Sequence, residues 1–199
     1  MLGRIQVESY RTLIMRINWV VASTYQLDPA IDADAIKNVG PVWGSWRTWR
    51  SCATDNVICH ESSRAQDLVA RNFQNDCNFY IHESNFVKLG RPPGMQVYSG
   101  DFLQEVDAIE DIIALHLAAA QSDIVILMGF ELTSIKGIND TFELHKKKNY
   151  HGLLRGVIAA HPETQWVVVD HNEKLDKNYQ TLPNLTCDTF GNVLQLLAQ

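Results

Sequence analysis

The sequence has no excess of positive charge. It contains 17 Lys and Arg against 23 Asp and Glu, which gives a formal net charge of −6 at pH 7. A broad nucleic-acid surface needs clustered Lys and Arg, so the composition argues against a nucleic-acid-binding protein. Hydrophobic residues make up 46% of the 199 residues and charged residues 20%. These fractions and this length are typical of a single globular domain, here residues 1–199.

Long apolar runs and targeting signals are also missing. No apolar run approaches the roughly 20 residues that a membrane-spanning helix requires. The first residues, MLGRIQVESYR, lack the apolar core of a signal peptide. The four cysteines form no CxxC pair and no regular spacing, which favours buried thiols in a reducing cytoplasm over disulfides. We therefore expect a cytoplasmic protein without a membrane partner.

The familiar catalytic and nucleotide-binding motifs are absent as well. The sequence has no GxSxG, no Walker A loop and no GxGxxG, which makes serine hydrolases, P-loop NTPases and ordinary dinucleotide-binding proteins unlikely relatives. It has no HxH, HxxxH or HExxH, so no metal is assigned. The sequence names no cofactor.

An apolar run from Asp123 to Phe130, DIVILMGF, predicts the central strand of the fold. A helical pattern precedes it at 106–121 and another follows it at 150–161, as in a β-α-β unit. We therefore predict an α/β fold, a Rossmann-like three-layer sandwich with a mostly parallel central sheet. Further strands are expected at 17–22, 56–59, 77–81, 95–99, 164–169 and 185–187.

Polar residues follow several of the predicted strands. They are His60, Glu61, His82, Glu83, Glu131, Asp170, His171 and Asp188. If the strands are parallel, their carboxyl ends meet at one edge of the sheet, where doubly wound sheets place ligands. The structural alternative is that polar residues follow buried strands because the chain there returns to water.

This predicted edge suits acid–base chemistry. A histidine beside a carboxylate can exchange a proton with a substrate near neutral pH. Glu131, Asp170 and His171 are the catalytic candidates, and His82 with Glu83 could serve in the same way. A transition-metal site with nitrogen and oxygen ligands is a competing interpretation of the same residues.

The segment VWGSWRTWR is unusually rich in tryptophan. Trp43, Trp46 and Trp49 recur every third residue, which predicts one stripe on a helix or 3₁₀ turn. In one interpretation the tryptophans only pack and the arginines are solvated. In the other, Gly44 and Ser45 let a ligand approach the backbone beside Trp43, while Arg47 and Arg50 clamp its phosphate or carboxylate.

The back half of the chain, from about Gln96, resembles Rossmann-type glycosyltransferase-related proteins. The segments that carry the resemblance are DIVILMGFEL, NDTFELHKKKNYHGLL, WVVVDHN and the late NVLQLL. Among these proteins, the back half resembles the bacterial sialyltransferase-like and motility-associated-factor group. The resemblance implies a nucleotide-sugar site lined by Glu131, His145, Tyr150 and His151.

Three functions compete on these grounds. The first is a nucleotide- or nucleotide-sugar-binding protein, in one form a glycosyltransferase-like transferase, with that small molecule as its partner. The second is a non-catalytic α/β module, either a nucleotide sensor or an assembly subunit, for example of a virus, that self-associates through the tryptophan-rich segment. The third is a metal-dependent hydrolase.

Overall fold

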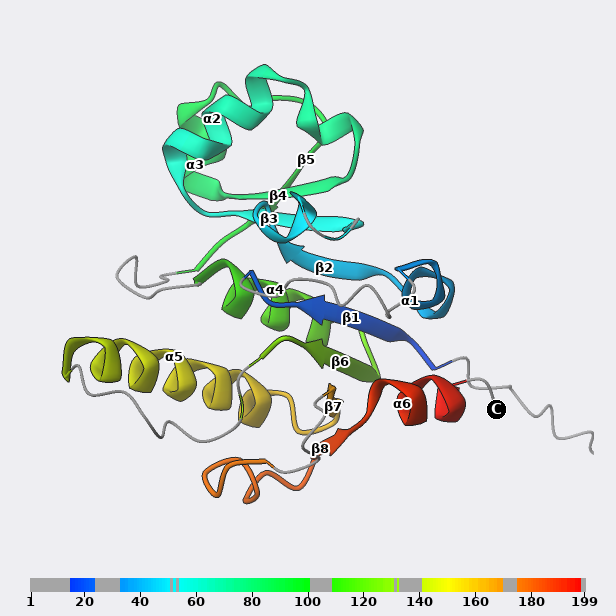
Figure 1. Ribbon diagram of the computed structural model, residues 1–199. Helices are drawn as coiled ribbons and strands as arrows, with labels where there is room; N and C mark the ends of the chain where they lie inside the picture. The colour runs from blue at the N-terminus through cyan, green and yellow to red at the C-terminus, as the bar shows by residue number, and fades with distance from the viewer. Residues whose placement is uncertain are drawn as a thin grey trace, which may run out of the picture.

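The computed structural model describes residues 15–23, 33–50, 52, 54–100, 109–130, 132, 141–169 and 175–197 (Figure 1). Eight strands form one sheet in the order β5-β4-β3-β2-β1-β6-β7-β8, and every neighbouring pair is parallel. The strands are β1 (Ile17–Val21), β2 (Val42–Ser45), β3 (Asn56–Cys59), β4 (Asn78–His82), β5 (Met95–Tyr98), β6 (Ile124–Met128), β7 (Gln165–Val169) and β8 (Leu185–Asp188). The predicted α/β fold with a parallel sheet is confirmed.

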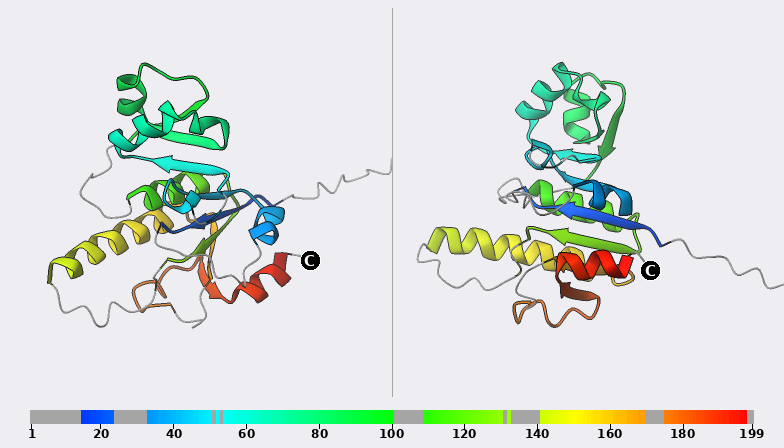
Figure 2. Two further views of the ribbon diagram at one scale, coloured as in Figure 1. Left: turned by 45° about the horizontal axis from the view of Figure 1, so that its top comes forward. Right: turned by 45° about the vertical axis from the view of Figure 1, so that its right-hand side comes forward.

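Helices cover both faces of the sheet (Figure 2). They are α1 (Ala33–Val39), α2 (Ser62–Ala70), α3 (Glu83–Lys88), α4 (Ile109–Ala119), α5 (Thr141–Ala160) and α6 (Phe190–Leu197), with short 3₁₀ turns η1 (Thr48–Arg50) and η2 (Phe73–Asn75). Side chains of α4 and α5 pack on one face, against residues such as Val20, Leu127 and Val168. Side chains of α1 and α6 pack on the other, against Trp19 and Ile126. These are the three layers of a Rossmann-like sandwich.

The order of the strands reverses between β1 and β6. The chain builds outward from β1 to β5, and α4 then carries it back to β6 on the other side of β1. β1 and β6 pair along their full length, from Ile17 opposite Ile124 to Val21 opposite Met128. In open parallel sheets a reversal of this kind opens a crevice at the carboxyl ends of the strands, where ligands bind.

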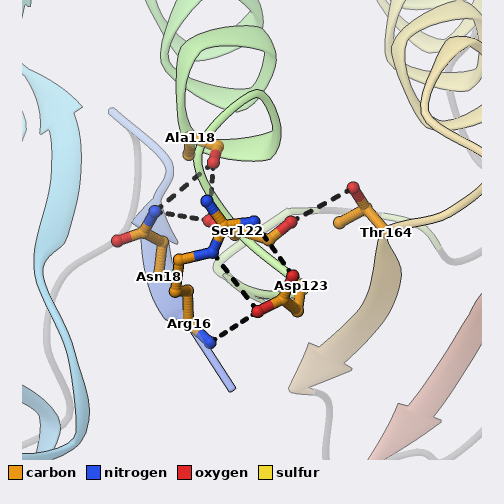
Figure 3. A network of polar contacts seen from close by, with 6 residues as sticks. All are labelled: Arg16, Asn18, Ala118, Ser122, Asp123 and Thr164. Atoms are coloured by element: carbon orange, nitrogen blue, oxygen red, sulfur yellow. Dashed lines mark hydrogen bonds and ion pairs between the residues drawn. The ribbon is translucent and has the colours of Figure 1, made fainter. Parts of the chain in front are cut away.

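A polar network lies at the amino ends of the strands, which we call the amino edge of the sheet (Figure 3). Asn18, buried in β1, donates to the carbonyl of Ala118 at 3.3 Å and bonds the hydroxyl of Ser122. The Ser122 hydroxyl donates to the same carbonyl at 2.6 Å. The carboxylate of Asp123 accepts from the backbone N–H of Arg16 at 2.8 Å and from its guanidinium at 3.0 Å. The network joins the starts of β1 and β6 to the end of α4.

A second buried amide ties β8 to this edge. The Asn184 side chain donates to the carbonyls of His161 and Thr164, both at 3.0 Å. These carbonyls lie between the end of α5 and the start of β7, and Asn184 is only 6% exposed. The His161 carbonyl also accepts from the backbone N–H of Thr164 at 3.2 Å, so the buried Thr164 carbonyl is the acceptor that depends most on this side chain.

The tryptophan-rich segment does not form the predicted stripe. Trp43 lies in β2, where it is 2% exposed and packs on Tyr80 with 5.2 Å between ring centroids. Trp46 follows the strand and is 8% exposed, whereas Trp49 lies in η1 and is 37% exposed. Because a strand rather than a helix holds Trp43, the spacing of three does not align the rings. The prediction of a helical stripe is therefore wrong.

Candidate functional site

Three aromatic side chains stand in a row at the carboxyl ends of β3, β4 and β5. Cys59 is paired with Ile81 across β3 and β4, which sets the next residues, His60 and His82, beside one another. His82 is in turn the partner of Tyr98 on β5. The His60 and His82 ring centroids are 5.6 Å apart, and those of His82 and Tyr98 are 5.5 Å apart. Parallel register alone therefore builds this row.

His60 is held by bonds from three different elements. Its Nδ1 lies 2.9 Å from the hydroxyl of Tyr98. Its backbone N–H donates to the carboxylate of Glu110 at 2.9 Å, and its carbonyl accepts from the amide of buried Asn85 at 2.9 Å. Burial, followed by the nearby His82, lowers the pKa of His60. The imidazole is therefore neutral near pH 7 and can accept or donate a proton through its ring nitrogens.

His82 has a defined tautomer. It is the N-cap of α3, and its Nδ1 accepts from the backbone N–H of Ser84 at 3.2 Å. Its Nε2 lies 3.1 Å from the carbonyl of Gly100, to which it can only donate. In the neutral ring the proton therefore sits on Nε2. This histidine caps a helix and anchors the chain beyond β5 at the same time.

Two adjacent carboxyl groups at the start of α4 reach the same edge. Glu110 bonds the backbone N–H of His60, as described above. Asp111, which is 1% exposed, accepts from the backbone N–H of Ser23 at 3.0 Å and from its hydroxyl at 3.0 Å. Ser23 lies two residues beyond the end of β1. α4 thus links the end of β1 to the end of β3.

Both carboxyl groups have pKa values near neutrality. Burial raises the pKa of Glu110 from its ordinary value of 4.5 to about 7, opposed in part by the bond from His60. Burial also raises the pKa of Asp111 from 3.8 to about 7, opposed by the bonds from Ser23. Arg47 lowers both pKa values by its charge without cancelling the effect of burial. Acids with a pKa near the working pH are suited to general acid–base catalysis.

Only part of the predicted edge comes together. Glu61 and Glu83 are exposed at the starts of α2 and α3. The hydrogen bonds described for the His60 and His82 rings go to Tyr98, Ser84 and Gly100, not to these carboxylates. The carboxylate of Asp188 accepts from the Thr189 N–H at 2.7 Å and the Asn192 amide at 2.8 Å, at the start of α6. Asp188 is on β8, at the opposite end of the sheet from β3, β4 and β5.

The residues implied by the resemblance lie elsewhere or outside the described residues. Tyr150 and His151 are on α5, whose connections are to β6 and β7, and His151 Nδ1 is 2.6 Å from the hydroxyl of Tyr179. The predicted catalytic residues Glu131, Asp170 and His171 lie outside the described residues, as does the side chain of His145. Their roles stay predictions.

The side chain of Ser45 forms hydrogen bonds within the turn that follows β2. Its hydroxyl accepts from the backbone N–H groups of Arg47 at 3.1 Å and Thr48 at 3.2 Å. The space above neighbouring Gly44 is filled by Thr48, since a Cβ on Gly44 would lie 2.8 Å from the Thr48 side chain. A glycine here permits close packing of the turn, not the approach of a ligand to the backbone as expected from the sequence.

The site contains residues that sequence reasoning missed, namely Ser23, Tyr98, Glu110 and Asp111. Tyr98 could have been found by aligning the strand ends, because it closes the strand after the one that ends in His82. Glu110 and Asp111 belong to an acid-rich stretch that reads only as a helix start. Ser23 carries no distinguishing signal in the sequence.

Comparison of the chain with protein-family models, with curated proteins and with solved structures finds no match. Within the described residues, no group of three or more His, Cys, Asp and Glu side chains is arranged to hold a metal ion. No helix in the same part of the chain has the length and apolar character needed to cross a membrane. None of the four cysteines, all of which are described, forms a disulfide.

Proposed function

We propose that the chain binds a nucleotide or a nucleotide sugar at the carboxyl edge of its sheet and acts on it as a glycosyltransferase-like transferase. The observation that carries this proposal is the row of His60, His82 and Tyr98 with the buried carboxyl of Glu110 against it. This group lies at the carboxyl ends of β3, β4 and β5, on the same side of the sheet as the crevice at the β1–β6 reversal where doubly wound sheets take their ligands.

The row supplies the groups that a transferase needs. A transfer from a nucleotide sugar to a hydroxyl acceptor breaks the bond between sugar and phosphate, releases the nucleotide, and requires a base that removes the hydroxyl proton as the new bond forms. Glu110, with a pKa of about 7, can hold or accept that proton at neutral pH. His60 adds a second neutral base, whose orientation is fixed by Tyr98. Proton exchange and positioning are thus provided within one short stretch of the edge.

The alternative of an assembly subunit loses much of its basis. It rested on an exposed tryptophan stripe, and Trp43 and Trp46 are instead buried in the chain's own core. Only Trp49, at 37% exposed, remains available to a partner. A nucleotide sensor stays compatible with the same site and differs from a transferase only in lacking turnover.

A thermal-shift panel of nucleotides and nucleotide sugars at millimolar concentration tests the proposal. A ligand at about 100 times its Kd adds about 2.7 kcal/mol to the free energy of unfolding, so the melting temperature should rise by several degrees. Glu110→Gln keeps an acceptor for the His60 N–H, so this variant should still bind but should not turn over a nucleotide sugar. Asn178→Ala, an exposed change on a distant turn, serves as the control.

No shift with any member of the panel would overturn the proposal. A shift without hydrolysis or transfer of any nucleotide sugar, followed by mass spectrometry, would leave the sensor and remove the transferase. If Glu110→Gln turned over substrate at the wild-type rate, Glu110 would not be the base.

A further inference from the structure

Three arginines converge on one buried indole beside the row. The guanidinium carbons of Arg64, Arg50 and Arg47 lie 4.3, 4.9 and 5.5 Å from the centroid of the Trp46 ring. Arg47 and Arg50 come from the turn after β2, whereas Arg64 comes from the first turn of α2, after β3. Cation–π contact with the ring stabilises each guanidinium and orients it. It does not remove the repulsion among three like charges around one ring, which solvent screens in part at exposed Arg47 and Arg50.

Within the described residues, carboxylates leave most of this arginine cluster without an ion pair. Among the described residues, the one ion pair to these arginines joins Arg64 to Asp67, at a rather long 3.7 Å. The carboxylate of Glu61, at the N-cap of α2, accepts a bond from the Ser63 hydroxyl at 2.7 Å. α2 has no acidic residue in its first turn, although an acid there would be favoured by the helix dipole. Arg64 occupies that turn instead.

Arg64 also has a donor that nothing in the described residues satisfies. Its Nε is buried and has no hydrogen-bond partner there. A buried N–H of a charged group without an acceptor is costly, because the group has lost its water without gaining a partner. A bound anion would supply the acceptor and also offset the repulsion among the three guanidiniums. Planar guanidinium forks match the oxygens of a phosphate group in particular.

The arginine cluster approaches the row and Glu110 through Arg47. The charge of Arg47 acts on both Glu110 and Asp111, and that of Arg64 acts on Cys59, the last residue of β3. Trp46 packs with Cys59 and Ile81, whereas Tyr98 belongs to the core beneath α4, so the cluster and the row lie on different faces at the ends of the same strands. Arg47 is the member of the cluster whose charge reaches the carboxyl group proposed as the base. A ligand with its phosphates here could present its remaining part to His60 and His82.

We infer that Arg47, Arg50 and Arg64, arranged around Trp46, form the phosphate-binding subsite for a ligand that carries a diphosphate. The assignment of that ligand as a nucleotide or nucleotide sugar rests on the proposed function. The anion site itself does not, because it follows from the arginine cluster alone. Arg64 is the central member, since its guanidinium lies closest to the ring and its Nε is buried.

Isothermal titration of the full chain with inorganic pyrophosphate tests the inference. We expect saturable binding by the wild type and a Kd at least about tenfold higher for Arg64→Gln, which removes the fork and the charge. Arg64→Lys keeps the charge and loses the fork, so it should fall between the two. Arg71→Gln removes an exposed arginine at the other end of α2 and should bind as the wild type does.

A change in tryptophan fluorescence gives a second, local measurement. Pyrophosphate bound over Trp46 should shift or quench the emission, and Trp46→Phe should abolish that change while leaving an aromatic face for the arginines. Circular dichroism of each variant shows whether it folds. If Arg64→Gln fails to fold, Arg50→Gln replaces it, because Arg50 is exposed on a short turn.

The outcomes separate this inference from the proposed function. No pyrophosphate binding by the wild type, or an equal loss in Arg64→Gln and Arg71→Gln, overturns the subsite. Nucleotide binding that ignores Arg64→Gln also overturns it but leaves the proposed function standing. Arginine-dependent pyrophosphate binding without binding of any nucleotide or nucleotide sugar keeps the subsite and removes the proposed function.

Discussion

Buried polar groups are satisfied in opposite ways at the amino ends and at the carboxyl ends of the strands. At the amino edge, buried Asn18 and Asn184 are neutral amides that donate to backbone carbonyls, and the exposed carboxylate of Asp123 is paired with Arg16. At the carboxyl edge, Asp111 is buried and Glu110 half-buried, neither forms an ion pair with a described residue, and burial raises both pKa values to about 7. Neutral donors satisfy the backbone cheaply, whereas buried acids cost stability.

The contrast indicates which edge carries function. A structural network is expected to minimise its electrostatic cost, as the amino edge does. A site that performs chemistry keeps groups with shifted pKa values, even though replacing them would stabilise the fold. We therefore expect substitutions at the amino edge to lower stability without affecting a ligand. Neutral substitutions of the two acids at the carboxyl edge should affect the ligand and raise stability.

Asn184→Ala should have the largest effect on folding. The substitution removes the side-chain donor from the buried Thr164 carbonyl and one of two donors from the half-buried His161 carbonyl, and it leaves a cavity where Asn184 was buried. We expect the free energy of unfolding to fall by about 2–4 kcal/mol, measured by urea denaturation. Asn178→Ala, on an exposed turn, is the control. A fall no larger than that of the control would show that the amino edge is not held by this amide.

Glu110→Gln should have a smaller effect of the opposite sign. Because the pKa of Glu110 is higher in the folded chain, its contribution to stability is fully present below pH 4.5 and is lost as the pH rises through 7. The variant should exceed the wild type by about 1–2 kcal/mol at pH 8, with a difference that shrinks toward pH 5.

Urea unfolding at pH 5, 6, 7 and 8 measures the effect of Glu110→Gln. Glu163→Gln removes an exposed carboxyl from the turn before β7, whose charge does not act on Glu110, and serves as the control. A gain that is the same at pH 5 and pH 8 would contradict a buried carboxyl with a raised pKa at this edge.

Asp123→Asn should have the smallest effect. Its ion pair with Arg16 is 3.0 Å long and solvent-exposed, and exposed pairs contribute little at physiological salt. An asparagine oxygen can still accept from the Arg16 backbone N–H. We expect the urea midpoint to stay within experimental error of the wild type, and to move slightly only at low salt. A large shift would place a charge-dependent contact at the amino edge and weaken the contrast.

The sequence was sufficient for most of the fold. The strand at Asn56–Cys59 and the run that became β6 are short, apolar and rich in β-branched residues, so pattern alone identified them. Val42–Ser45 was missed because it contains a glycine and begins a series of tryptophans at a helix-like spacing. It becomes a strand through pairing with β1 and β3, which is tertiary information.

The candidate site was predictable only where parallel register sufficed. His60 and His82 both follow apolar strands, so their convergence follows from a parallel sheet. Tyr98 looks like any aromatic strand residue, and Glu110 like any acid at a helix start. What distinguishes Glu110 is its burial against β3, which no local pattern encodes. The same holds for Arg64, which reaches Trp46 from the next element along the chain.

The row at the ends of β3, β4 and β5 also has a spacing that is fixed by the pairing of the strands. Neighbouring strands are about 4.8 Å apart, so each position in the row is spaced by the backbone and not by its own side chain. Exchanging one side chain therefore leaves the backbone spacing of the other two positions unchanged, although it removes any bond that the side chain made to its neighbours. Inserting one residue in β4 would instead turn His82 to the opposite face and remove the middle of the row. For protein engineering, the row is a set of three adjacent side-chain positions at a fixed pitch on a rigid sheet.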